Sequence, residues 1–173
     1  MNRSAWLRLA PVAVLLALGA TPMASAQEHF QAVVRGTQET PANASVGRGH
    51  LDLTISADGT QISYTLVYPS VPGGVTQAHL HLGQLSVAGG IFLFLCTNLG
   101  NGPAGTQACP DAPGQVSGTW TASDITSGAA GQGIAPGDFK AVLRSIRNGV
   151  VYVNVHSHTY PPGEVRGQIL PKQ

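Results

Sequence analysis

The sequence predicts an all-β protein, a Greek-key-like β-sandwich or flattened barrel of seven or eight strands with one short helix. Three observations support this prediction. The chain is rich in glycine, threonine, serine and valine and poor in lysine and glutamate, a composition that favours an all-β protein. Short apolar segments alternate with polar residues at the two-residue period of a strand. Clusters of glycine, proline, asparagine and aspartate separate these segments, as turns do.

The N-terminus predicts a secretory signal peptide over residues 1–26. Arg3 and Arg8 supply positive charge, an apolar run covers 9–20, and Ala24–Ser25–Ala26 is a small-residue cleavage site. The apolar run is too short to cross a bilayer comfortably. We therefore expect an exported protein, periplasmic or secreted, with no membrane span after cleavage.

Residues 27–173 are expected to form a single domain, because their length suits one core and no linker interrupts them. Removal of the two N-terminal arginines leaves seven basic residues against eight acidic ones. This balance argues against a nucleic-acid-binding surface. Gly-x-Ser-x-Gly and P-loop motifs are absent from the chain. The acidic residues are few and scattered, which argues against the carboxylate pair of a glycosidase.

Six strands are expected before the helix, and alternation or turn signals define each of them. They are Phe30–Arg35, His50–Ser56, Ile62–Leu66, Thr76–Gly83, Ile91–Leu95 and Gln115–Thr121. Asp58–Gly59 is typical of a hairpin turn, so the second and third strands should pair. The fifth is continuously apolar, which is typical of a strand buried on both faces.

The segment 138–147 departs from the strand pattern and predicts a helix. Its apolar residues recur at the helical spacing i, i+3, i+4 and i+7. Asp138 is a favourable N-cap, and Asn148–Gly149 is a favourable stop. Asn148–Gly149 could also form a hairpin turn, but the residues before it do not alternate cleanly.

Two final strands are expected over Val150–His158 and Glu164–Leu170, with a turn at Tyr160–Gly163 between them. In the first of them valines form one stripe. The opposite stripe consists of Tyr152, Asn154, His156 and His158.

Cys96 and Cys109 are the only cysteines, and they enclose a 14-residue segment rich in glycine, asparagine and proline. Exported chains meet an oxidising compartment, so we expect a disulfide. Two thiolate metal ligands are the alternative, which is disfavoured because no histidine lies close to these cysteines in sequence.

Four of the six histidines occur as two His-x-His pairs, and these pairs predict a metal site. Side chains two apart on a strand share a face, so His79 and His81 lie together, as do His156 and His158. Both pairs lie opposite an aliphatic stripe, which places the imidazoles on the outer face of the sheet. The alternative is a solvated polar face. His50, beside Asp52, and His29 are weaker candidates.

The metal hypothesis requires the two pairs to lie on neighbouring strands, since facing side chains are then close enough to share an ion. Copper is the first choice and zinc the second, because neutral imidazole binds both. A near-planar set of four nitrogens would favour Cu(II).

Four segments resemble the CHRD domain, a family named for chordin and common in exported bacterial proteins. They are Val34–Pro41, Ala78–His81, Tyr152–His156 and Gly163–Ile169. The resemblance implies a β-sandwich and matches His79, His81 and His156 to family positions. His158 and the cysteine pair depart from the family pattern, as does Leu82, which stands before Gly83.

Arg166 lies two residues from Glu164 on the last strand, and two interpretations of it remain open. It forms a structural ion pair with Glu164 or a neighbour, or it lies near the histidines and steers an anion toward a metal. A short resemblance to copper-zinc superoxide dismutases motivates the second interpretation, because they also carry a strand His-x-His, a later strand histidine and a C-terminal arginine.

Three functional hypotheses follow from these patterns. The first is an exported CHRD-domain module that binds copper or zinc. The second is a copper-dependent redox enzyme, and the third is a metal-free structural or interaction domain of the cell envelope. The sequence leaves enzymatic activity and any protein partner undecided.

Overall fold

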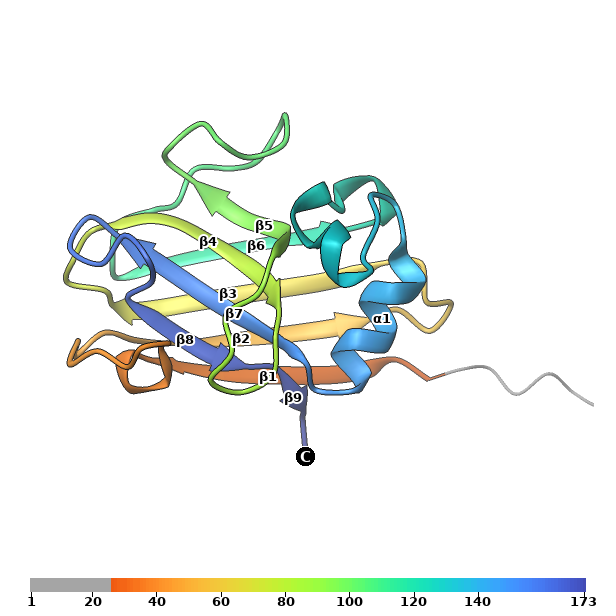
Figure 1. Cartoon of the computed structure of the whole chain (residues 1–173), viewed down its shortest axis with the longest axis horizontal. Helices are drawn as coiled ribbons and strands as arrows, with labels where there is room; N and C mark the ends of the chain where they lie inside the picture. The colour runs from red at the N-terminus through yellow and green to blue at the C-terminus, as the bar shows by residue number, and fades with distance from the viewer. Residues whose placement is uncertain (1–25) are drawn as a thin grey trace, which may run out of the picture.

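The described residues, 26–173 of a computed structural model, form one curled antiparallel sheet with a short helix at one end (Figure 1). The predicted signal peptide lies outside the described residues except for Ala26. The sheet is a nearly closed barrel, so the all-β prediction is confirmed in its flattened-barrel form. Within residues 26–173, no helix is long and apolar enough to cross a membrane.

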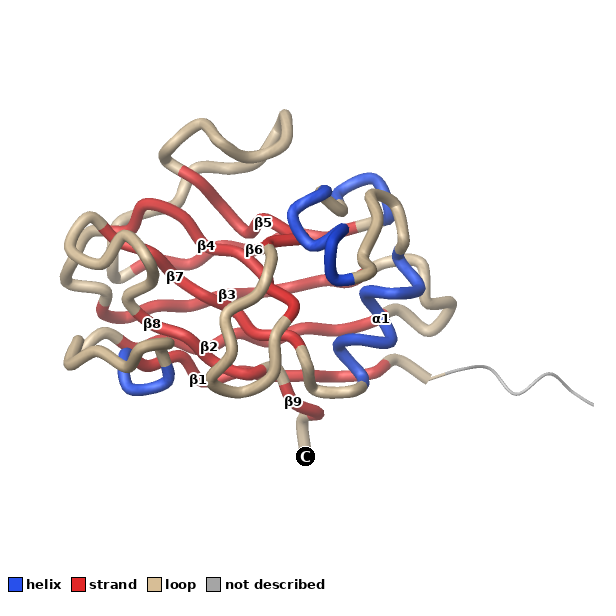
Figure 2. The backbone as a smooth tube through the Cα atoms, in the orientation of Figure 1, coloured by secondary structure: helices blue, strands red, loops and turns tan. Residues whose placement is uncertain are grey.

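Eight strands make up the barrel, and Figure 2 shows them running side by side with loops at both ends. They are β1 (Glu28–Arg35), β2 (Arg48–Ile55), β3 (Ile62–Ser70), β4 (Val75–Leu82), β5 (Ile91–Thr97), β6 (Gly114–Trp120), β7 (Val151–Ser157) and β8 (Val165–Gln168). Their order in the sheet is β5-β4-β7-β8-β1-β2-β3-β6, and the two-residue β9 (Leu170–Pro171) pairs with β1. Strands distant in sequence, such as β4 and β7, are therefore neighbours.

Alternation decides which side chains fill the barrel. Leu80 of β4 and the three valines of β7, Val151, Val153 and Val155, are fully buried in the core. Burying an aliphatic side chain of this size contributes about 1.5–3 kcal/mol each. Because side chains alternate across a strand, the residues between them lie on the outer face.

The barrel is closed at the seam between the edge strands β5 and β6 by side chains. Trp120 donates its indole N–H to the Phe94 carbonyl at 2.9 Å, and Tyr64 donates its hydroxyl to the Leu95 carbonyl at 3.3 Å. The Gln107 amide donates to the carbonyls of Leu95 and Ser117 at 3.2 and 3.1 Å. These bonds give partners to backbone carbonyls of β5 and β6 that would otherwise be unpaired at the two open edges of the sheet.

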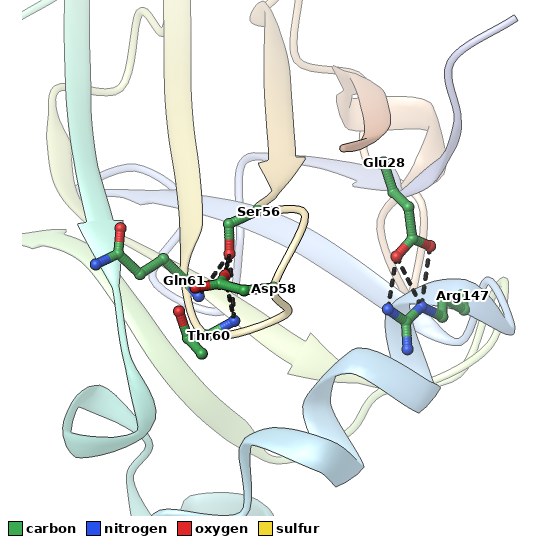
Figure 3. Close-up of polar contacts among 6 residues, drawn as sticks. All are labelled: Glu28, Ser56, Asp58, Thr60, Gln61 and Arg147. Atoms are coloured by element: carbon green, nitrogen blue, oxygen red, sulfur yellow. Dashed lines mark hydrogen bonds and ion pairs between the residues drawn. The ribbon is translucent and has the colours of Figure 1, made fainter. Parts of the chain in front are cut away.

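The hairpin between β2 and β3 forms at the predicted turn (Figure 3). Gly59 has a φ of +67°, a conformation that glycine adopts without strain. Asp58 accepts hydrogen bonds from the Ser56 hydroxyl at 2.6 Å and the Thr60 backbone at 3.1 Å. The Gln61 backbone donates to Ser56 Oγ at 3.0 Å.

The predicted helix is confirmed as α1 (Phe139–Arg147), whose apolar face packs on the core at one end of the barrel (Figure 1). Asp138 caps it by accepting a backbone hydrogen bond at 2.9 Å, and Gly149 follows it with a φ of +66°. Arg147 donates to Glu28 at 2.9 Å and so links α1 to β1 (Figure 3). Three short 3₁₀ segments, Gly36–Gln38, Ala122–Asp124 and Ser127–Gln132, add turns that the sequence did not predict.

Cys96 and Cys109 form the expected disulfide, which excludes them as thiolate ligands in this structure. The bond ties the long loop after β5 back to that strand. The Thr97 backbone N–H also donates to the Gln107 carbonyl at 2.9 Å, so Gln107 is held at the barrel seam.

Replacing both cysteines with serine is expected to lower the free energy of unfolding by about 3 kcal/mol, the loop-closure value for a link of this length. Urea unfolding monitored by tryptophan fluorescence measures it. The oxidised wild type is the reference, and reduced wild type should match the variant. Equal midpoints for the variant and the oxidised protein would contradict the prediction.

Candidate metal site

The two strands that carry the His-x-His pairs are direct antiparallel neighbours. In the β4–β7 register, His79 faces Asn154, His81 faces Tyr152, and His156 faces Gln77. His156 is thus diagonal to His79 on the same outer face. The condition that the two segments be adjacent in space is met.

Three imidazoles converge there, those of His79, His81 and His156. The His79 ring centroid lies 4.9 Å from that of His156 and 5.6 Å from that of His81. One ring nitrogen from each residue lies within 4.8 Å of the other two. Metal–nitrogen bonds of about 2.0–2.1 Å place such donors roughly 3.3–3.6 Å apart. Binding an ion would therefore draw the donors together by at most about 1 Å.

All three imidazoles are buried on the outer face of the sheet because other segments cover them. His79 is fully buried, and His81 and His156 are 7% and 6% exposed. Phe94 of β5 packs edge-on against His79, with ring centroids 4.5 Å apart. The loop after β4 and the turn after β7 cover the other two, which differs from the solvated face considered as the alternative.

Backbone carbonyls orient two of the three rings. His81 Nδ1 lies 2.9 Å from the Gly89 carbonyl oxygen, and His156 Nδ1 lies 2.9 Å from the Pro161 carbonyl oxygen. A carbonyl oxygen only accepts, so each Nδ1 carries the proton and each Nε2 presents a lone pair. Metal-binding histidines are typically held in this way.

Four ring nitrogens in this cluster are buried without a hydrogen-bond partner in the described chain. They are Nδ1 and Nε2 of His79, Nε2 of His81 and Nε2 of His156. A buried polar atom without a partner costs about 1–3 kcal/mol. A cluster of buried nitrogens without partners is compatible with a site that holds a metal ion.

Burial also keeps the three imidazoles neutral. It lowers the pKa of His79 to about 2, with smaller contributions from His156 and His81. It lowers the pKa of His81 to about 4, against the opposing hydrogen bond to Gly89, and it lowers the pKa of His156. Neutral imidazole is the form that binds a metal.

Acidification is expected to destabilise the metal-free protein through these histidines. The unfolded chain takes up protons below an imidazole pKa of about 6.5, whereas buried His79 stays neutral to much lower pH. Titration of His79 therefore leaves the free energy of unfolding unchanged above about pH 6.5 and lowers it as the pH falls below that value. Between pH 7.5 and pH 5 the loss is about 2 kcal/mol for His79 alone.

A comparison of variants isolates this effect in urea unfolding with a chelator present. Burial raises the pKa of Glu39 to about 7, so protonation of Glu39 stabilises the folded protein as the pH falls over this range. The measured change in the free energy of unfolding with pH is therefore the histidine effect minus the Glu39 effect. His79→Leu should lose less stability between pH 7.5 and pH 5 than wild type, while exposed His158→Ala should match wild type. Equal slopes for wild type and His79→Leu would contradict the assignment.

Two side chains, Tyr152 and Arg166, stack behind the His81 ring and support it. The Tyr152 ring lies parallel to the His81 ring, with centroids 4.7 Å apart and planes at 6°. The Arg166 guanidinium covers the Tyr152 ring at 3.4 Å. The Tyr152 hydroxyl accepts a hydrogen bond from the backbone of Gly89, whose carbonyl binds His81.

Arg166 holds the loop over the histidines in place. It is 2% exposed and donates to the carbonyls of Gln84 and Val87 at 3.0 Å and to Thr40 at 3.2 Å. Glu164 binds Ser45 and the Gly73 backbone instead, so the Glu164–Arg166 ion pair does not form. The structure assigns the guanidinium to the loop and leaves it little access to a dissolved anion.

The remaining candidate histidines lie outside the cluster. β7 ends at Ser157, and His158 is exposed, with its backbone bonded to the Gly74 carbonyl. His50 is bonded to Asp52 at 3.0 Å, and His29 is bonded to Thr54 at 3.0 Å. The structure thus brings together three of the four histidines proposed as ligands.

Two further buried polar residues, Glu39 and Asn154, lie beside the histidine cluster, and the sequence analysis did not predict them as part of the site. The Asn154 amide donates to Glu39 at 3.4 Å, and each residue keeps one buried oxygen without a partner in residues 26–173. A Cβ at Gly163 would lie 2.6 Å from Glu39 Oε1 and 2.7 Å from the Asn154 amide. Asn154 could have been found, since it lies on the stripe of His156, whereas Glu39 comes from a distant turn.

The fold and the site together define an antiparallel β-barrel domain with a buried set of three histidines on its outer face. The family model of the CHRD domain matches residues 30–169. The chain belongs to the CHRD domain family, as its motifs predicted. The search of curated proteins finds no match.

Proposed function

We propose that this protein is an exported module that binds one transition-metal ion, copper or zinc, through His79, His81 and His156. The observation that carries the proposal is the set of three neutral, buried imidazoles whose ring nitrogens lie within 4.8 Å of one another. The carbonyl bonds at His81 and His156 support it further, because they leave both Nε2 lone pairs facing no protein donor in the described chain.

Three nitrogen donors suit both ions that the proposal names. A square of four nitrogens, which would favour Cu(II), needs His158, and His158 is exposed outside the cluster. Three protein ligands leave a fourth position for water or another small ligand. The choice between copper and zinc is therefore an outcome of the experiment.

Metal titration of the purified protein tests the proposal. After treatment with a chelator, the protein is titrated with Zn²⁺, with Cu²⁺ and with Cu⁺ kept reduced by ascorbate, which leaves the Cys96–Cys109 disulfide intact. Bound metal is counted by elemental analysis. We expect about one equivalent of metal, and ¹⁵N NMR of the diamagnetic Zn²⁺ form should show shifts of three imidazoles. No uptake would overturn the proposal and favour the metal-free structural domain. Uptake that leaves these three imidazoles unshifted would overturn the ligand assignment.

The buried donors favour a binding module over a redox enzyme. A redox substrate must reach the ion through an open coordination position, and the ring nitrogens without partners are shielded from solvent. The redox alternative predicts superoxide turnover by the loaded protein faster than by the same concentration of free ion. A rate no higher than that of the free ion would remove this alternative.

A further inference from the structure

A groove lies on the outer surface of β1–β3, on strands other than those that carry the histidine cluster. Its volume is about 580 Å³, within the range of small-molecule sites. Three exposed valines line it, Val33 (47% exposed), Val46 (74%) and Val67 (38%). These side chains give the groove an apolar lining that could cover the apolar part of a small ligand.

Two arginines lie at the same groove. Arg35 and Arg48 are direct register partners on β1 and β2, and both are exposed. Like charges directly opposite each other in a sheet are destabilising. Neither guanidinium has a hydrogen-bond or ion-pair partner among residues 26–173, so nothing in the described chain neutralises this pair.

The positive part of the groove, formed by the arginine pair, lies next to its apolar part, formed by the valines. Val33 and Val67 both pair with His50 in the strand register, one step along the sheet from the arginine pair. No aspartate or glutamate is among the described residues that line the groove. Asp52, the next residue on the His50 face, is already bonded to His50 and to Lys172, the latter at 2.7 Å.

We propose that this groove binds a small amphipathic anion, a carboxylate with an apolar chain. The two guanidiniums would hold the carboxylate, because their planar donors match its two oxygens. The three valines would cover the chain. Charge complementarity selects the anion, and the valines select a ligand with an apolar part over a bare anion. The proposal is independent of any metal at the histidine cluster.

Octanoate is a suitable probe, and isothermal titration calorimetry with two-dimensional NMR measures its binding. We expect saturable binding, with shifts confined to β1–β3 and the loop that carries Val46. Acetate, octanol and octylammonium should each bind at least about tenfold more weakly, because each lacks one of the two features. An affinity for acetate equal to that for octanoate would mean that the site binds any small anion. An affinity for octanol equal to that for octanoate would mean that the arginines play no role. Either result overturns the proposal.

Variants separate specific recognition from overall charge. Arg35→Gln and Arg48→Gln should each weaken octanoate binding at least about tenfold, the effect of losing a charge-assisted contact. Val46→Asn should weaken octanoate binding as well. Arg144→Gln removes an exposed positive charge from α1 and should leave binding unchanged. No binding of octanoate, or an equal loss in Arg144→Gln, would overturn the proposal.

Discussion

Replacing His79 or His156 with alanine is expected to lower the metal affinity of the protein by more than about 100-fold. Each substitution removes one of only three nitrogen donors, and even residues that merely orient metal ligands contribute about 10–100-fold. His158→Ala is the matched control, because His158 is exposed and lies outside the cluster. Competition titration against a chromophoric chelator measures all three affinities.

The stability of a leucine variant at position 79 tells a lost ligand from a damaged fold. His79→Leu removes two buried nitrogens without partners and keeps an apolar side chain against Phe94. We therefore expect its metal-free form to be at least as stable as wild type, because the cost of burying unpaired polar atoms disappears. Loss of metal binding together with retained stability would identify His79 as a ligand. An unchanged affinity in His79→Leu, or a loss in His158→Ala equal to that in His79→Ala, would contradict the assignment.

Replacing Arg166 with methionine is expected to lower the free energy of unfolding by about 3 kcal/mol. The variant leaves the carbonyls of Gln84 and Val87 without their buried donor and uncovers the Tyr152 ring, and losing a buried charged hydrogen-bond donor typically costs this much. The loop that presents the Gly89 carbonyl to His81 then loses its support. Metal affinity should fall by about 10–100-fold, the usual effect of a residue behind a ligand.

Arg166→Lys distinguishes support of the loop from attraction of an anion. Lysine keeps the charge but cannot reproduce the planar set of donors that reaches two carbonyls and Thr40. We therefore expect Arg166→Lys to bind metal nearly as weakly as Arg166→Met. Metal affinity restored by lysine would contradict the supporting role. Chemical unfolding and chelator competition on the same samples provide both measurements.

The elements that could be predicted from the sequence are those that depend on residues close together in the chain. The hairpin at Asp58–Gly59 and the cap at Asp138 depend on residues within a few positions of each other, and both form as expected. The alternation in β7 correctly separated Val153 from His156, since it is a property of the strand itself. His158 shares the spacing, but the strand ends at Ser157 and the chain turns before His158 can extend the stripe.

The sequence by itself determined the fold class and the face on which His79, His81 and His156 lie, because the two-residue period of a strand is encoded locally. Only the tertiary structure decided that β4 and β7 are neighbours, since strands separated by some 70 residues pair through nonlocal contacts. It also decided that carbonyls of Gly89 and Pro161 orient two rings, and that Arg166 supports the loop above them. These partners come from turns and loops, whose positions depend on packing of the whole barrel rather than on any local period.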